Sequence, residues 1–234
     1  MIMQRKFVKS GIPGLDTILG GGFMEGSIIT LSGPTGCGKS TFAMQFIYNG
    51  ATAYNEPGLY ITIEEDKDSM FFHMSGYTWD LNSIEKEKKL IVLDYPLYEV
   101  DQFLNQYGAI QEIINSTGVK RVVIDSIMPV AVYFKDDIER KKGFLRLIDN
   151  IRKWGATTII VSEDTPATTQ DVLPDTHYGI ESFTDGWIHI YHLFSAKTRE
   201  RTKAIEVIKM KAAAHSTKIY PTVITNSGFK IGLK

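Results

Sequence analysis

The chain has 234 residues, of which 43% are hydrophobic and 23% charged, and its formal net charge at pH 7 is −1. This length suits one large α/β domain, and the near-zero charge excludes a general electrostatic attraction to nucleic acid or anionic membranes. A single cysteine excludes an internal disulfide, and no apolar run is long enough to span a bilayer. With an N-terminus that lacks an apolar signal core, these features predict one cytoplasmic domain, residues 1–234, that does not contact membranes.

Through the first two thirds of the chain, short apolar runs rich in β-branched residues alternate with longer stretches of helical periodicity. Strands separated by helices in this way are typical of a mostly parallel sheet covered on both faces. Gly118 and Gly155 follow two of the helices, where left-handed caps are expected. The predicted strands are 27–33, 58–63, 90–95, 121–127 and 157–163, and the predicted helices are 40–54, 100–118 and 138–155.

The pattern changes after Asp185 to short alternating strands with tight connections. This change predicts an antiparallel extension at one edge of the same sheet, with no linker to a second domain. The apolar segment 70–74 is expected in the core rather than on a partner-binding surface. The helix at 138–155 is predicted to bury a broad apolar face made of Ile138, Phe144, Leu145, Leu147, Ile148 and Ile151.

The segment GPTGCGKST, residues 33–41, has the spacing G-x-x-x-x-G-K-[ST] of a phosphate-binding loop. Its glycines let successive N–H groups point at phosphate oxygens, and the helix that follows adds a positive N-terminal dipole. Lys39 is expected to reach the terminal phosphates and Ser40 to ligate Mg²⁺, while Cys37 is interpreted as a space-filling residue rather than a redox switch. The predicted nucleotide-binding residues are Gly33, Thr35, Gly36, Cys37, Gly38, Lys39, Ser40 and Thr41.

Two other predicted strands end in carboxylates. YITIEED ends in Glu64, Glu65 and Asp66, and RVVIDSI carries Asp125. Each group has an ordinary interpretation, as acids at a helix start or as the cap of a turn. Ligands of an open parallel sheet bind beyond the carboxyl ends of its strands, so the phosphate loop on a third strand favours a shared nucleotide and metal site.

From Ser10 to Ser40, SGIPGLDTILGGGFMEGSIITLSGPTGCGKS, the chain resembles the KaiC-like branch of the RecA superfamily of ATPases. The resemblance continues through YITIEED, KRVVIDSI, TTIIVSED, HYGIESFTDGWIHI and KAIEVIKMKAAAH, in order along nearly the whole chain. It implies a RecA-like α/β fold with ATP and Mg²⁺ bound between protomers of a homo-oligomeric ring, commonly a hexamer. The chain has one such unit and not the tandem pair of the circadian clock protein, so single-domain archaeal relatives, including RadA paralogues, are the closer comparison.

The resemblance also implies roles for individual residues. Glu64 and Glu65 match a catalytic glutamate pair. Lys39 of the phosphate loop is predicted to be the third catalytic residue. Because adjacent strand residues point to opposite faces, we expect Glu64 to deprotonate the attacking water and Glu65 to support it, while Asp66 only starts a helix. Asp125 matches the aspartate associated with Mg²⁺, and Ser40 matches the hydroxyl ligand of the metal.

The family motif Lys-x-Arg-Gly-x-x-His, which acts on the nucleotide of a neighbouring protomer, matches Lys209, Met210 and His215, but Lys211 replaces the arginine and Ala212 the glycine. Arginine presents a planar fork to phosphate and lysine only a point charge, so ATP binding is expected to survive while hydrolysis is slow. The alternative is that both lysines are simply solvated on one face of a strand and that His215 is structural.

Three functions stay open at this point: a nucleotide-dependent ATPase that acts as a regulator or assembly module, a DNA-binding recombination accessory protein, and an ATP-binding scaffold with little turnover. Glu163 stands where recombinases of the superfamily usually carry glutamine, which weighs against strand exchange. Nucleic-acid binding is suggested by the polar loop 163–179 and by a basic hairpin, although a solvated hairpin is the ordinary interpretation. The basic residues are Lys197, Arg199, Arg201 and Lys203, interrupted by Glu200.

Overall fold

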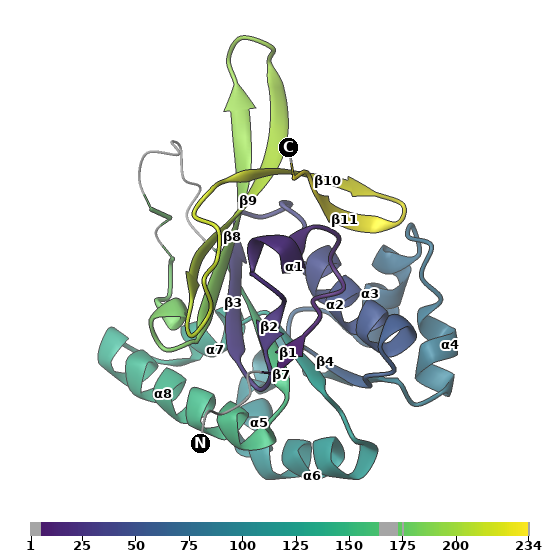
Figure 1. The fold of residues 1–234 in the computed structure, drawn as a ribbon. Helices are drawn as coiled ribbons and strands as arrows, with labels where there is room; N and C mark the ends of the chain where they lie inside the picture. The colour runs from purple at the N-terminus through teal and green to yellow at the C-terminus, as the bar shows by residue number, and fades with distance from the viewer. Residues whose placement is uncertain (1–5, 164–172, 175, 234) are drawn as a thin grey trace, which may run out of the picture.

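The computed structural model describes residues 6–163, 173–174 and 176–233, so most of the polar loop 163–179 lies outside the described residues. The described chain forms a nine-stranded sheet in the order β11-β10-β9-β8-β3-β7-β6-β4-β5, with helices on both faces (Figure 1). A separate small sheet pairs β1 (Phe7–Val8) with β2 (Phe23–Met24). The strands of the large sheet are β3 (Ile28–Gly33), β4 (Gly58–Thr62), β5 (Leu90–Asp94), β6 (Arg121–Asp125), β7 (Thr157–Glu163), β8 (Gly186–Ser195), β9 (Glu200–Met210), β10 (Tyr220–Thr225) and β11 (Gly228–Ile231).

The predicted α/β class is confirmed, with one correction at the junction of the two halves of the sheet. Strands β3 to β7 are parallel to their neighbours, as expected. Strand β8, predicted as part of the antiparallel extension, is parallel to β3, and the antiparallel order begins with β9. The central stretch of β8 is buried because it continues the covered parallel sheet, whereas alternation alone could not show which neighbour it joins.

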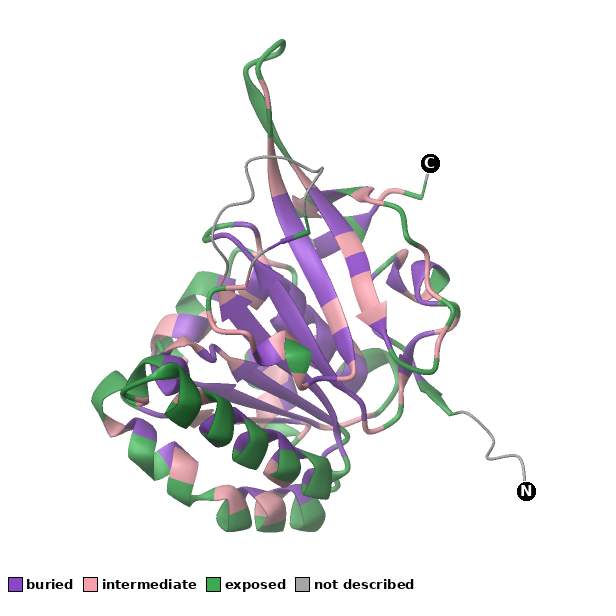
Figure 2. Ribbon diagram, turned by 90° about the vertical axis from the view of Figure 1, so that its left-hand side faces the viewer, coloured by how far each residue is buried: buried purple, intermediate pink, exposed green. Residues whose placement is uncertain are grey.

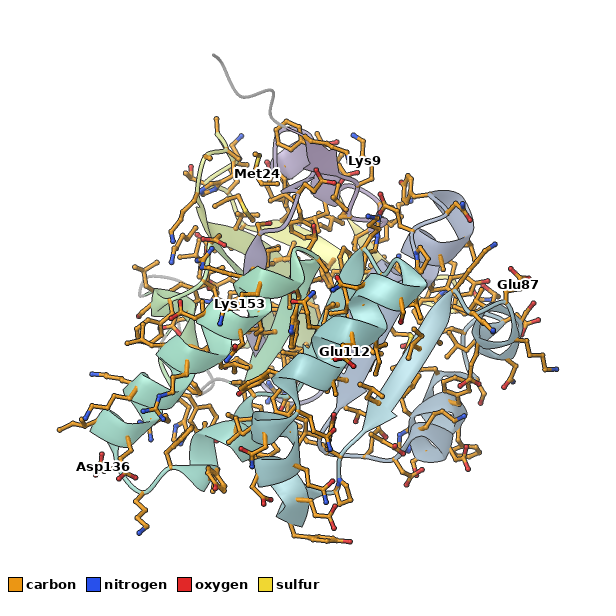
Figure 3. The ribbon with its side chains drawn as sticks, turned by 90° about the horizontal axis from the view of Figure 1, so that it is seen from below. Lys9, Met24, Glu87, Glu112, Asp136 and Lys153 are labelled. Atoms are coloured by element: carbon orange, nitrogen blue, oxygen red, sulfur yellow. The ribbon has the colours of Figure 1, made fainter. Side chains whose placement is uncertain are left out.

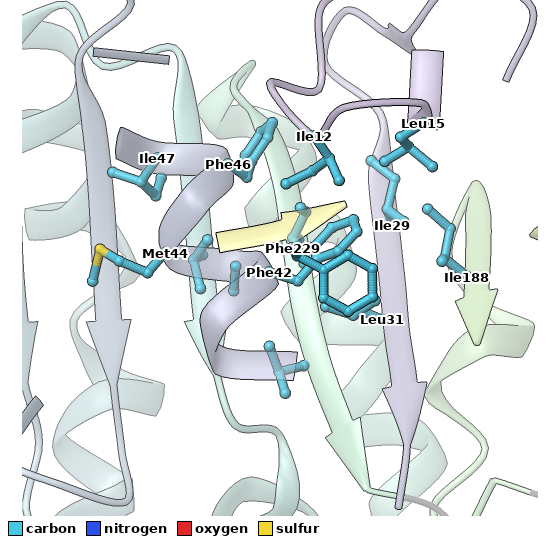
Figure 4. Packing of buried hydrophobic residues seen from close by; sticks show 14 of the residues in the cluster. Ile12, Leu15, Ile29, Leu31, Phe42, Met44, Phe46, Ile47, Ile188 and Phe229 are labelled. Atoms are coloured by element: carbon cyan, nitrogen blue, oxygen red, sulfur yellow. The ribbon is translucent and has the colours of Figure 1, made fainter. Parts of the chain in front are cut away.

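Alternate side chains of the central strands pack into two separate hydrophobic cores, one on each face of the sheet. Ile29 and Leu31 of β3 pack with the helix after the phosphate loop (Figure 4). Ile28 belongs to the core on the other face. This division follows from the two-residue period of a strand. The first face carries α2 (Lys39–Ala53), α3 (Lys67–Met74) and α4 (Leu81–Lys86), and the second carries α5 (Val100–Asn105), α6 (Tyr107–Thr117), α7 (Met128–Tyr133) and α8 (Asp137–Trp154). Short helical segments are α1 (Leu15–Ile18), η1 (Leu97–Glu99) and η2 (Ile180–Ser182).

Several local predictions about the helices are confirmed. Gly118 and Gly155 end α6 and α8 in the left-handed conformation, with φ of 69° and 67°. Asp66 is the N-cap of α3, where its carboxylate accepts a hydrogen bond from the Ser69 N–H at 2.8 Å. The predicted helix at 100–118 is two helices, because Gln106 leaves helical geometry between α5 and α6 and its side chain accepts a hydrogen bond from the Tyr95 hydroxyl.

The predicted buried face of α8 is wrong at two positions. Ile138 is 66% exposed and Leu145 is 48% exposed, while Phe144, Leu147, Ile148 and Ile151 are buried. The buried four repeat at helical spacing, and Leu145 lies about 100° around the helix from Phe144. Ile138 belongs to the first turn, near Asp136 at the outer end of the helix in Figure 3.

The core prediction for segment 70–74 holds for its two methionines and fails for one aromatic residue. Met70 and Met74 are buried on the inner side of α3, but Phe72 is 75% exposed. A helix of this length can bury only one stripe, so Phe72 and His73 turn outward, whereas Phe71 is partly buried against the same core. No helix among the described residues has the length and apolar content that a membrane crossing would need.

Beyond the body of the sheet, β8 and β9 continue as a projecting two-stranded hairpin. We call residues 193–202 the β8–β9 arm; within it Phe194 pairs with Arg201 and Ser195 with Glu200. The arm is mostly exposed, in contrast to the buried central parts of the same two strands (Figure 2). The basic hairpin predicted from sequence is therefore an arm that stands away from the core.

Candidate functional site

The phosphate loop connects β3 to α2, and its backbone needs glycine at several positions. Gly33, Gly36 and Gly38 have φ of 153°, 77° and 107°. A Cβ on Gly33 would lie 2.5 Å from the Ile190 carbonyl oxygen, and one on Gly38 would lie 2.4 Å from Ile224 Cδ1. The loop can therefore keep its tight turn only where no side chain is present, which leaves its N–H groups available at the start of α2.

Lys39 folds back over the loop that precedes it. Its Nζ donates hydrogen bonds to the carbonyl oxygens of Gly33 at 2.8 Å and Pro34 at 3.2 Å, and the residue is buried. These contacts place an ammonium group beside the backbone of the loop at the start of α2, which is an arrangement suited to an anion. Cys37 is fully buried in the core beneath the loop, in agreement with its interpretation as a space-filling residue.

A cavity of about 440 Å³ lies beside the phosphate loop, at the carboxyl ends of β3, β4, β6 and β7. The structure thus brings together loop residues and carboxylates that are far apart in sequence, as the strand endings predicted. The predicted residues on its wall are Thr35, Gly36, Gly38, Lys39, Ser40, Thr41, Glu64 and Asp125, and Glu163, which was not predicted as a site residue, joins them. Gly33 and Cys37, also predicted to bind nucleotide, are not on the wall: Gly33 holds Lys39 through its carbonyl, and Cys37 supports the loop from below.

The two adjacent glutamates face different surroundings. Glu64 lines the cavity and accepts a hydrogen bond from the Ser126 hydroxyl. Glu65 lies on a neighbouring cavity of about 400 Å³ and pairs with His73 Nδ1 at 2.7 Å. Glu64 also borders this second cavity, and both glutamates come after the last residue of β4 and not within it.

The pKa of Glu64 is raised above its usual range, chiefly because its carboxyl group loses hydration at the cavity wall. The nearby charges of Asp125 and Glu163 raise it further, while the Ser126 hydroxyl and Lys39 oppose the shift. The residue as a whole is exposed, so water still reaches its carboxyl group and moderates the effect. A carboxylate with this shift is a better proton acceptor than an ordinary surface glutamate.

Asp125 lies at the end of β6, beside the hydroxyl groups of Tyr60 and Ser40. The Tyr60 hydroxyl donates to its Oδ2 at 2.5 Å, and the Ser40 hydroxyl lies close enough to lower the pKa of Asp125. Burial raises the pKa of Asp125, against the effect of these hydroxyl groups and of Lys39. Ser40 and Asp125 thus present oxygen donors side by side, next to the loop that would hold phosphate.

This donor set fits Mg²⁺ bound together with a nucleotide. Among the described residues, no group of three or more His, Cys, Asp or Glu side chains is placed to hold a metal ion by itself. Mg²⁺ commonly takes only one or two protein oxygens and completes its shell with water and substrate phosphates. A hydroxyl and a carboxylate beside a phosphate loop are the ligands that this mode requires.

The residues of the predicted trans motif are not part of this cavity. Lys209 donates to the Glu181 carbonyl oxygen at 2.9 Å, Lys211 pairs with Asp185 at 3.2 Å, and His215 bonds the Ser216 carbonyl oxygen. Along β9, Lys209 is six residues beyond the cavity-lining Lys203, which corresponds to about 20 Å of strand. The residues of the trans motif therefore lie toward the opposite end of the sheet from the phosphate loop of the same protomer.

Met210 and Ala212, next to these lysines, have distinct local settings. The Met210 side chain is buried against Gly186, so it does not share the exposure of the lysines beside it. Ala212 has a φ of 60°, in the left-handed region that favours glycine. The conformation explains why a glycine suits this position in the family motif.

The cavity also has wall residues that the sequence reasoning did not assign to it. Lys203, predicted as part of the basic hairpin, donates a hydrogen bond from its Nζ to the Gly36 carbonyl oxygen at 3.0 Å. Tyr77 bonds Thr41 through its hydroxyl at 2.8 Å and stacks on Trp79 with ring centroids 4.4 Å apart. No local sequence signal pointed to these contacts, since they depend on strand pairing and loop placement. The unassigned residues are Tyr77, Ser126, Val161, Lys203 and Ile224.

Comparison with known proteins agrees with this geometry. The family model described as "ATPase: KaiC" matches residues 8–234. The UPF0273 protein MJ1359 of Methanocaldococcus jannaschii is 31% identical, with 95% of each chain covered. The crystal structure of the KaiC-like protein PH0186 from Pyrococcus horikoshii has a TM-score of 0.83 and 36% sequence identity, and the match covers 97% of this chain and 99% of that one.

Relatives of greater length also match. The circadian clock oscillator protein KaiC of Parathermosynechococcus lividus is 31% identical over 95% of this chain, but the match covers only 42% of that protein. The same protein of Synechococcus elongatus is 30% identical, with 44% of its length covered. The chain therefore spans less than half the length of the clock proteins that it matches.

Proposed function

Because the chain belongs to the KaiC family of ATPases, we propose that it binds Mg²⁺-ATP in the cavity beside the phosphate loop and hydrolyses it with Glu64 as general base. The observation that carries this proposal is that one cavity wall holds Lys39, Ser40, Glu64 and Asp125 together. This reaction needs a cation that binds phosphate, two oxygen atoms that ligate the metal, and a carboxylate that accepts a proton from water. A single-domain ATPase built in this way would act as a nucleotide-dependent regulator or assembly module.

The loop and Lys39 bind the phosphates. N–H groups of the phosphate loop and the N-terminus of α2 donate to the phosphate oxygens, and Lys39 exchanges its carbonyl partners for the negatively charged phosphates. Ser40 and Asp125 would hold the Mg²⁺, which, when bound, neutralises charge on the β- and γ-phosphates. Thr41, Tyr77 and Ile224 form another part of the wall, where an apolar and aromatic surface suits the nucleoside.

Glu64 acts on the water. Its carboxylate orients a water molecule toward the γ-phosphorus and accepts its proton as the new P–O bond forms and the bond to the β–γ bridging oxygen breaks, leaving ADP and phosphate. The Ser126 hydroxyl holds one carboxylate oxygen, which limits rotation of the group. Glu65, paired with His73 outside the cavity, serves in support of the loop that carries Glu64.

A second copy of the chain completes the site. Lys209, Lys211 and His215 lie toward the far end of the sheet, so they can approach a phosphate loop only when that loop belongs to another protomer. Each protomer would offer its cavity to one neighbour and these three residues to the other neighbour. Repeated contacts of this kind close into a ring, and the family pattern suggests a hexamer. Lys211 in place of arginine weakens the contact with the γ-phosphate, so slow turnover is expected. If turnover were slow enough, the protein would act as a scaffold that binds ATP and hardly hydrolyses it.

Nucleic-acid binding is the second candidate function, and the shape of the β8–β9 arm favours it. Arg201 lies over the Phe194 ring at 5.5 Å, and Phe194 is 59% exposed. An exposed aromatic ring beside cationic side chains is typical of surfaces that stack bases and contact phosphates. The affinity of the wild type for single-stranded DNA should then fall steeply with added salt and drop in Arg201→Ser, and binding that ignores salt would exclude this function.

The test of the ATPase proposal measures ATP hydrolysis against protein concentration for wild type and Glu64→Gln. We expect specific activity to rise with concentration as shared sites assemble, and to fall by at least about 100-fold in Glu64→Gln while ATP binding persists. The matched control is Glu65→Gln, which removes the neighbouring carboxylate from outside the cavity and should lose much less activity. Concentration-independent turnover would contradict the shared site, and full activity in Glu64→Gln would contradict the assigned base.

A further inference from the structure

Tyr60 is an aromatic residue of a central strand whose hydroxyl meets the carboxylate of the proposed metal site. It lies on β4, next to β6, with Thr62 opposite Asp125 and Tyr60 opposite Val123 in the parallel register. The Tyr60 ring therefore starts two residues before the level of Asp125 and reaches forward, so that its hydroxyl donates to Asp125 Oδ2 at 2.5 Å. The contact links two strands at the floor of the cavity.

The hydroxyl is not required for packing. Tyr60 is 1% exposed and belongs to the same apolar core as Val123 and Phe42. A phenylalanine would fill the same space without a polar group to satisfy, and burying a hydroxyl stabilises a fold only when it has a partner. The partner here is a carboxylate at the carboxyl end of the sheet, where ligands of this architecture bind.

We propose that Tyr60 is a positioning residue for the metal: by holding one oxygen of Asp125, it fixes the carboxylate in the orientation that receives Mg²⁺ beside Ser40. The inference rests on the proposed function, since it concerns the Mg²⁺ that accompanies ATP. Tyrosine suits the role because its neutral phenol donates one directed hydrogen bond at neutral pH and its ring is held by the core.

The surroundings of Asp125 explain why it needs this partner. The side chain is partly buried, and the other hydroxyl that acts on it belongs to Ser40, itself a predicted metal ligand. When Ser40 turns its hydroxyl lone pair to a metal, the Tyr60 hydroxyl still fixes the carboxylate. Hydrogen-bond partners behind metal ligands typically contribute about 10- to 100-fold to metal affinity, which sets the size of the expected effect.

The experiment compares wild type with Tyr60→Phe by titrating Mg²⁺ into each protein together with a fluorescent ATP analogue. We expect the half-saturating Mg²⁺ concentration to rise about 10-fold in Tyr60→Phe, while the affinity for the analogue in excess EDTA is unchanged. Binding of Mn²⁺, read by its paramagnetic resonance signal in the presence of ATP, should weaken by the same factor. These readouts do not depend on turnover.

Tyr191→Phe is the matched control. The Tyr191 hydroxyl also donates to a carboxylate, Glu206 Oε2, at 2.5 Å, and Tyr191 is also buried, but neither residue lines the cavity. Removal of this hydroxyl costs a similar buried hydrogen bond and should leave the Mg²⁺ midpoint at its wild-type value. An equal rise in both variants would mean a general loss of stability and would overturn the proposal.

Additional variants test whether the effect of Tyr60 passes through Asp125 and whether it survives a loss of folding. In the Asp125→Asn background, Tyr60→Phe should change the Mg²⁺ midpoint no further, because the group that Tyr60 positions is gone. Tyr60→Met, a second way to delete the hydroxyl, should reproduce the rise if Tyr60→Phe has lost its cooperative thermal transition. A wild-type midpoint in a folded Tyr60 variant overturns the positioning role alone. A wild-type protein whose nucleotide affinity is insensitive to Mg²⁺ overturns the proposed function and this inference with it.

Discussion

The Nζ of Lys203 donates a hydrogen bond to the carbonyl oxygen of Gly36 at 3.0 Å and so connects the base of the β8–β9 arm to the phosphate loop. Lys203 is half-buried and lines the same cavity as Lys39. The two lysines belong to segments more than 160 residues apart, since the hydrogen bond spans 167 positions. The loop is therefore held between its own helix and an antiparallel strand.

Replacing Lys203 with methionine should weaken ATP binding. The change removes a cation from the phosphate side of the cavity and frees the Gly36 carbonyl, and a charged hydrogen bond of this kind contributes about 1.5–3 kcal/mol. We expect the KM for ATP to rise about 10-fold or more. Arg201→Met, which removes a cation two residues away in the exposed arm, is the control and should leave KM near the wild-type value. Equal KM values for the two variants would contradict a role for Lys203 at the nucleotide.

The rate of hydrolysis should depend on pH through Glu64. A general base works only when deprotonated, so activity should rise with pH through the pKa of Glu64 and disappear below it. Because loss of hydration raises that pKa above its usual value of 4.5, the acid limb of kcat/KM should lie above pH 4.5. Ser126→Ala removes a hydrogen bond that stabilises the carboxylate and should move the limb to still higher pH. A limb that stays in place in Ser126→Ala would show that another group controls it.

Lys211→Arg should raise the rate of hydrolysis. A guanidinium offers two parallel donors to a γ-phosphate where an ammonium offers a point charge, so we expect kcat to increase by about 10-fold or more. Lys211 is exposed and pairs with Asp185, which also binds Arg152, so the change is compatible with the fold. Lys218→Arg at another exposed position is the control. A kcat unchanged by Lys211→Arg would mean that this residue does not contact the nucleotide.

Ala212→Gly should stabilise the protein. Ala212 holds a φ of 60°, which costs an alanine about 1 kcal/mol and a glycine almost nothing, although glycine also gains freedom in the unfolded chain. The net effect is a stabilisation of up to about 1 kcal/mol, or a Tm increase of about 2–4 °C for a domain of this size. Ala214→Gly, at an exposed position outside the left-handed region, should lower Tm instead. Thermal unfolding of both variants checks the opposite signs.

Much of the architecture could be predicted because it depends on local patterns. The phosphate loop is defined by residue spacing, and the carboxylates of Glu64 and Asp125 follow strands whose parallel order sends their ends to one edge. Gly118 and Gly155 were identifiable as caps because a left-handed residue after a helix favours glycine in any context. Exposure was harder to predict: Phe72 and Leu145 look apolar in sequence, but only the packing of α3 and α8 determines which stripe is covered.

The sequence by itself determined that three strands end in a phosphate loop, a pair of glutamates and an aspartate, because each of these signals lies within a few consecutive residues. Only the tertiary structure decided which distant residues join them. Lys203 reaches Gly36 and Tyr60 reaches Asp125 because of sheet order and register, which no local pattern records. The same register separates Lys209 and Lys211 from the cavity by the length of a strand, and a second protomer is the physical means by which they could reach it.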